Sequence, residues 1–224
     1  MLRYDFKNAA GVHCISAGFS ENRKLGLQQL VVQTYHFSHE QVKSSNFELD
    51  AGNCLDCPFS FNSGNGSCYT HKGLINFGLK SMLKRLNKNK PKEFDQQEFD
   101  NFLRKVGKMK IDLIRFGAYG EPVLLGETIV QSLLSLNYNK FTGYTHTWKR
   151  TDFQWAKDYF KASVHSVSQL ALARSLGWSS YLPLEKPEKI GVLCPNDIAK
   201  VTCSDCGLCN AKFKPDIIAK LKYQ

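Results

Sequence analysis

The sequence predicts an α/β fold, built mainly on a parallel sheet or a partial barrel of βαβ units, with cysteine-rich metal-binding loops. From residue 111 onward, short runs rich in β-branched and aromatic residues alternate with helical periodicity, which is the pattern of βαβ units. About four such units are present, too few for a complete eight-stranded barrel. Cysteines gather near both ends of the pattern, in stretches too polar to be core elements.

The N-terminal part, residues 1–110, is expected to hold strands near 11–17 and 28–35, where β-branched residues are frequent. Residues 51–73 are rich in Gly, Asn and Ser and predict a loop. Helical spacing follows at 74–83, then a Lys/Asn/Pro linker at 86–92 and a second helix over 94–106.

The second part, residues 111–224, predicts the alternating elements. Strands are expected at 111–116, 141–145, 162–167, 178–182 and 190–193. Helices are expected at 121–136, at 152–160, and from an N-cap at Ser168 through Leu176.

The composition is that of a globular protein: 224 residues, 42% of them hydrophobic. We find no apolar run of membrane-spanning length and no signal peptide, so we expect a cytoplasmic protein without a membrane partner. The formal charge of +10 leaves nucleic acid as an alternative partner. The densest basic run, residues 80–92, lies at the end of an expected helix, where a solvated helix end is favoured over a phosphate-binding patch.

Eight cysteines narrow the class of protein. Without an export signal, four disulfides are not expected, and the Cys-x-x-Cys spacings favour metal binding. The most specific motif is Cys203-Ser-Asp-Cys206-Gly-Leu-Cys209, because bacterial ferredoxins use this triple spacing and take a further thiolate from a distant Cys-Pro. Cys194-Pro195 lies a short distance upstream and is predicted to complete the ligand set. Structural zinc on the same four sulfurs is the alternative.

The loop at 51–73 contributes Cys54, Cys57 and Cys68. Three thiolates on a [4Fe–4S] cluster leave one iron open for a ligand, whereas His71 as a fourth ligand gives a plausible zinc set. A third alternative is that both cysteine groups serve one cluster. Cys14 stands alone in an apolar segment and is expected to be a buried core thiol.

These motifs resemble the radical S-adenosylmethionine enzymes. In that family three cysteines hold a cluster with an open iron, and the last is often followed by an aromatic residue, as in Cys68-Tyr69. The resemblance implies that Gly120, Glu121 and Pro122 match the segment that binds the methionine amine. Between residues 50 and 210 the chain is also similar to small radical-S-adenosylmethionine-like proteins of bacteriophages. The cysteine loop is longer than the family's compact C-x₃-C-x₂-C, and Tyr119 replaces a glycine.

Polar residues near strand ends are further candidates, because α/β folds place ligands there. Arg115, His146 and His165 are candidates for contact with a substrate or second metal.

The sequence therefore predicts a cytoplasmic [4Fe–4S] protein with one or two clusters. The resemblance to bacteriophage proteins implies that it is phage-encoded and located in the host cytoplasm. It would act with a redox partner protein in electron transfer, iron handling or redox sensing. The alternatives are a radical S-adenosylmethionine enzyme, with that cofactor, and a zinc-stabilised nucleic-acid-binding protein. No catalytic residue is assigned.

Overall fold

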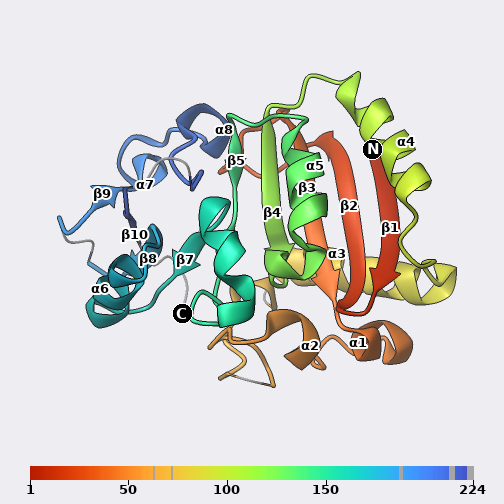
Figure 1. Ribbon diagram of the computed structural model, residues 1–224, viewed down its shortest axis with the longest axis horizontal. Coiled ribbons are helices and arrows are strands. Elements are labelled where there is room, and N and C mark those ends of the chain that lie inside the picture. Colours follow the sequence, from red (N-terminus) through yellow and green to blue (C-terminus); the bar gives the residue numbers. More distant parts are fainter. Residues whose placement is uncertain (63, 72, 187–188, 212–214, 221–224) are drawn as a thin grey trace.

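The computed structural model describes residues 1–62, 64–71, 73–186, 189–211 and 215–220. Ten strands in these residues form two sheets of five strands each, with helices packed against them (Figure 1). The predicted α/β class is confirmed. None of the described helices has the length and apolar character that a membrane crossing requires.

The bounds of the elements are as follows. The strands are β1 Leu2–Asn8, β2 Gly11–Phe19, β3 Leu30–Phe37, β4 Leu113–Tyr119, β5 Phe141–Thr142, β6 Tyr144–Thr145, β7 Lys161–Ser163, β8 Ser180–Leu184, β9 Val192–Leu193 and β10 Ile217–Lys220. The α-helices are α1 His39–Ser44, α2 Ala51–Cys54, α3 Gly73–Asn89, α4 Gln96–Gly107, α5 Glu127–Leu134, α6 Val167–Ser175, α7 Pro195–Ala199 and α8 Cys203–Cys206. The 3₁₀ helices are η1 Tyr69–His71, η2 Pro122–Leu125 and η3 Thr151–Asp158.

The first sheet has the strand order β1-β2-β3-β4-β5 and is mixed. Strands β1, β2 and β3 pair antiparallel, whereas β4 runs parallel to both β3 and β5. The long register between β2 and β3, from Val12 opposite Phe37 to Phe19 opposite Leu30, makes this hairpin the structural centre of the N-terminal part.

The second sheet has the order β6-β7-β8-β10-β9, and all its pairs are parallel. Only Gly143 separates β5 from β6, so the second sheet continues where the first one ends. A side chain at Gly143 would meet the ring of Phe160 at 2.5 Å, which explains the need for glycine at this junction. The expected mainly parallel sheet is therefore present as one mixed and one fully parallel sheet.

Helices cover both faces of the first sheet. On one face, α4 and α5 pack on β1 to β4 around a core that includes Phe6, Phe102, Ile114 and Val130 (Figure 1). On the other face, α3 buries Leu83 and its neighbours against a smaller core with Phe37 and Tyr119. Alternate residues of each strand feed the two cores, as the period of two in a strand requires. Cys14 is fully buried, as predicted for a core thiol.

Several local expectations need correction. The periodicity gave no signal for β1 or β10, since each depends on pairing with distant strands. The helix expected at 121–136 is split into η2 and α5 because Gly126 adopts φ +81°. Helix α6 is capped by Ser166, whose Oγ accepts from the Gln169 amide, and not by Ser168. The expected linker at 86–92 overlaps the last turn of α3.

Candidate metal centres

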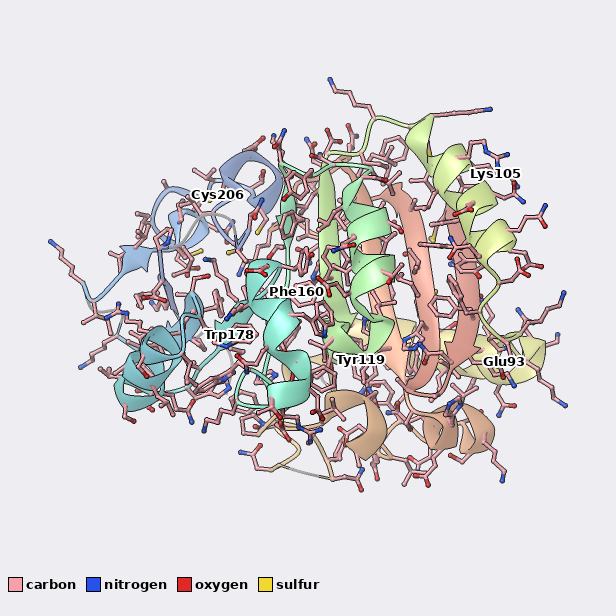
Figure 2. All side chains as sticks on the ribbon, viewed as in Figure 1. Glu93, Lys105, Tyr119, Phe160, Trp178 and Cys206 are labelled. Carbon is pink, nitrogen blue, oxygen red and sulfur yellow. The ribbon has the colours of Figure 1, made fainter. Side chains whose placement is uncertain are left out.

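Four cysteines of the C-terminal part line one pocket: Cys194, Cys203, Cys206 and Cys209. Aromatic and aliphatic side chains from the second sheet, among them Tyr181 and Ile217, form the rest of its wall. Figure 2 shows Cys206 in α8, apart from the sheet end that carries Tyr119. All eight cysteines of the chain lie in described residues, and each is a free thiol.

Local structure explains how these cysteines are held. Thr202 caps α8, its side chain accepting from the Asp205 amide, and Gly207 ends the helix in the left-handed region at φ +66°. The Cys203 amide donates to the Lys24 carbonyl at 2.8 Å. The Cys194 amide donates to the carbonyl of Ile218, also at 2.8 Å. Two segments far apart in sequence therefore fix the cysteine motif.

Three basic side chains act on the cysteines of this pocket. Burial raises the pKa of the Cys203 thiol to about 11, although Lys24 and Arg115 oppose that shift. Burial also raises the pKa of Cys209, against a hydrogen bond with Tyr144 and the charge of Lys161. The Lys161 side chain is fully buried, and its Nζ donates to the Pro215 carbonyl at 3.0 Å. Lys24, Arg115 and Lys161 therefore oppose the effect of burial on these thiols without outweighing it.

A second group of cysteines lies at the opposite ends of the strands and consists of Cys54, Cys57 and Cys68. Cys54 ends α2, which lies at the lower end of β4 in Figure 1. Burial raises the pKa of Cys54, and further increases come from Asp50, Cys57 and Cys68, so the three thiols are electrostatic neighbours. The buried Asp50 carboxylate secures the loop by accepting from the Phe61 amide at 2.8 Å.

Glu121 faces this second group but is already engaged. Its carboxylate is 3% exposed and accepts from the Thr145 hydroxyl at 2.6 Å. It also accepts from the His146 backbone amide at 3.1 Å and pairs with Nδ1 of the same residue at 2.7 Å. Burial would lower the pKa of His146, but hydrogen bonds to Cys57 and Glu121 raise it to about 10. Cys57, His146 and Glu121 thus form one hydrogen-bonded chain.

The neighbours of Glu121 have structural roles. Gly120 adopts φ +74°, and a Cβ there would lie 2.6 Å from the carbonyl oxygen of His36. Pro122 is the first residue of η2, where its missing amide costs no hydrogen bond. The Glu121 amide donates to the Asn53 carbonyl at 2.7 Å, which ties this segment to the helix that carries Cys54.

The remaining candidates take different positions. His165 stacks on His146 with ring centroids 5.3 Å apart, so it belongs to the second group. The His71 ring packs on Phe61 at 4.2 Å, and its electrostatic partners are Asp50, Glu48 and Lys80 rather than cysteines. Arg115 donates to the Tyr69 hydroxyl at 3.2 Å and interacts with the charge of Cys203. It therefore lies between the two cysteine groups.

No three His, Cys, Asp or Glu side chains within the described ranges meet at one point, as the ligands of a single ion must. Comparisons of the chain with protein-family models, curated proteins and solved structures find no match. The two cysteine groups must therefore be interpreted from their own chemistry. Sequence reasoning missed Lys24, Lys161 and Tyr144, and no local motif marks any of them.

Proposed function

We propose that the chain is an iron–sulfur protein that binds a [4Fe–4S] cluster through Cys194, Cys203, Cys206 and Cys209. The observation that carries the proposal is that these four cysteines line a single pocket. A four-iron cluster receives each thiolate on a different iron atom, so its ligands need not meet at one point. A zinc ion, by contrast, needs all four sulfurs about 2.3 Å from one centre.

The charges around the pocket support a cluster. Four thiolates and a four-iron core carry a net charge of about −2. Lys24, Arg115 and Lys161 all act on Cys203 or Cys209, and they would offset that charge inside a largely apolar wall. Such compensation is what a buried anionic group requires.

Hydrogen-bond donors around the pocket also fit. The Thr142 side chain lines the pocket, and its hydroxyl is buried without a partner among the described residues. The Tyr144 hydroxyl is hydrogen-bonded to Cys209. Hydrogen bonds to the sulfurs are among the means by which proteins set the reduction potential of such clusters. The Thr142 hydroxyl is therefore a donor available to such a cluster.

The proposed role is electron transfer, iron handling or redox sensing together with a protein redox partner. The proposed location is the cytoplasm, which is the host cytoplasm if the protein is phage-encoded. The positive balance of the chain suits an acidic partner surface. A nucleic-acid role with structural zinc is the weaker proposal because the geometry of a single-ion site is not preformed in the described residues.

The test is metal analysis of anaerobically purified protein. We expect a brown protein with a broad visible absorption and with iron and acid-labile sulfide in equal amounts. Iron near four atoms per chain indicates one cluster, and a value near eight indicates that the second cysteine group is also loaded. A colourless protein with stoichiometric zinc would refute the proposal.

A second candidate function, a radical S-adenosylmethionine enzyme, is favoured by one observation: Cys54, Cys57 and Cys68 are neighbours at the carboxyl ends of β4 and β6. Ligands in parallel α/β folds bind at that edge. Against it, the carboxylate of Glu121 is already occupied by Thr145 and His146. A methionine amine would have to displace these bonds.

The enzyme is tested by adding S-adenosylmethionine to the reduced protein. An altered electron paramagnetic resonance spectrum together with release of deoxyadenosine, lost in Glu121→Ala, would establish it. We expect neither change, because the Glu121 carboxylate is buried and fully paired.

A further inference from the structure

A separate pocket, here called the α3 pocket, lies between α3, the α1–α2 connection and the loop that joins Cys57 to Cys68. Its volume is about 420 Å³, within the range of small-molecule sites. Aromatic, polar and charged side chains line it, among them Phe47, Glu48, Phe61, His71, Asn76, Lys80 and Lys84. No cysteine lines it, although Phe61 and His71 lie in or directly after the loop that joins Cys57 to Cys68.

One wall of the α3 pocket is aromatic and rigidly supported. Phe61 stacks on His71, with ring centroids 4.2 Å apart and planes at 16°, and Phe47 meets His71 edge-on at 5.1 Å. Phe47 in turn stacks on the buried Tyr119 at 4.9 Å, and its carbonyl accepts from Gln41 at 2.7 Å. Phe61 is 38% exposed, which leaves ring surface for a planar ligand.

The opposite wall is basic. Lys80 and Lys84 both line the pocket and are four residues apart, so they share one face of α3. Like charges at this spacing destabilise a helix slightly, and an anion bound between them removes that repulsion. Both belong to the basic run of residues 80–92. The sequence left two interpretations of that run open, and the pocket now favours phosphate binding for these two lysines.

Polar atoms between the two walls lack partners. The side-chain oxygen of Asn76 is buried with no hydrogen bond among the described residues. Neither ring nitrogen of His71 has a partner at full hydrogen-bond geometry there, although the Gly66 carbonyl lies close enough to raise its pKa against the lowering by burial. Native proteins rarely leave such groups unpaired, and a ligand is one way to satisfy them.

We propose that the α3 pocket binds a free nucleoside monophosphate. Its base would stack on the wall of Phe61 and His71, and its phosphate would lie against Lys80 and Lys84. Aromatic stacking combined with a basic surface is the general chemistry of nucleotide binding.

Isothermal titration calorimetry of the purified chain with adenosine 5′-monophosphate tests the proposal. Adenosine and inorganic phosphate, titrated separately, should each bind at least about tenfold more weakly, because each makes only half of the contacts. The double variant Lys80→Ala/Lys84→Ala should weaken binding about tenfold or more. Phe61→Leu keeps apolar volume but removes the ring, and it should weaken binding about tenfold.

Lys88→Ala is the matched control: it removes an exposed lysine from the same helix that does not line the pocket, and affinity should be unchanged. All variants should keep the metal content of the unmodified protein, so this test does not depend on the cluster proposal. Equal affinity for phosphate and the nucleotide, or no effect of the lysine pair, would overturn the proposal. A hexameric oligoadenylate that binds more than about tenfold tighter would overturn the choice of a free nucleotide in favour of a strand.

Discussion

Acidification should destabilise the protein through two buried histidines, His13 and His36. Their Nδ1 atoms are 2.9 Å apart, and the outer nitrogens contact Asn8 Oδ1 at 2.9 Å and Thr34 Oγ1 at 3.0 Å. Asn8 Oδ1 also accepts two backbone amides, so it is an acceptor for His13, while Thr34 Oγ1 accepts from the Gly117 amide. With both rings neutral, every bond of this chain is made when the Thr34 hydroxyl donates to His36 and His36 donates to His13, and burial disfavours the charged alternative.

Burial, followed by the charge of His39, lowers the pKa of His13 from 6.5 to about 3, and burial also lowers that of His36. The unfolded chain therefore takes up protons below about pH 6.5 that the folded chain refuses, and stability is lost as the pH falls. Each ring contributes a slope of about 1.4 kcal/mol per pH unit. Between pH 7 and pH 5 this amounts to about 2 kcal/mol for His13, and the lowered pKa of His36 acts in the same direction.

Urea denaturation at pH 7, 6 and 5 measures the effect. In His13→Gln the loss of unfolding free energy between pH 7 and pH 5 should be smaller by about 2 kcal/mol than in the unmodified protein. His39→Gln removes an exposed histidine and only the smaller cause of the lowered pKa of His13, so it should change the pH dependence far less than His13→Gln does. Comparing variants separates this contribution from that of His165, whose pKa burial lowers to about 4. If the unfolding free energy of His13→Gln falls with pH as steeply as that of the unmodified protein, the assignment of neutral rings is refuted.

Three further outcomes are expected. Gly120→Ala should lower the free energy of unfolding by about 2 kcal/mol or more in thermal unfolding, because the φ of Gly120 is +74° and the new Cβ would lie 2.6 Å from a backbone oxygen. The control Gly78→Ala should be neutral or stabilising, since its Cβ would meet nothing within 4 Å. Cys206→Ser should lose iron and solubility together, whereas Cys14→Ser should keep its iron and lose about 1 kcal/mol; equal loss of iron in both would contradict the ligand assignment. Lys161→Met should make the reduction potential of the proposed cluster more negative in spectroelectrochemistry, because the variant removes a buried cation near Cys209. An unchanged potential would contradict a role of Lys161 in compensating the charge of the cluster.

The sequence allowed the fold class to be predicted because it depends on local periodicity. Strand β4 and helix α4 lie close to their expected positions, since each carries a clear repeat of buried residues. The C-terminal cysteine group was predicted from spacing alone, and the structure places those four residues around one pocket. Spacing is informative here because Cys203, Cys206 and Cys209 are close neighbours in the sequence, so local geometry alone keeps them together.

The features that the sequence could not provide depend on distant pairing. The position of Lys161 beside Cys209 requires β7 and the Cys209 turn to meet, and no local pattern records that. The engagement of Glu121 depends on the register that brings Thr145 and His146 beside it. From the sequence, Glu121 matches a ligand-binding motif only by resemblance, and its hydrogen-bond partners could not be predicted because they follow it by more than twenty residues.

The position of β10 has a consequence for the order of assembly during synthesis. Strand β10 inserts between β8 and β9, and its Ile218 carbonyl accepts the amide of Cys194. Until residues 217–220 leave the ribosome, β9 and Cys194 have no edge on which to pair, although β1 to β8 can already fold. The cysteine pocket is therefore the last part of the described fold to be completed. Under the cluster proposal, iron would be delivered only after that strand is translated, and a nascent chain would expose thiols that the finished protein partly buries.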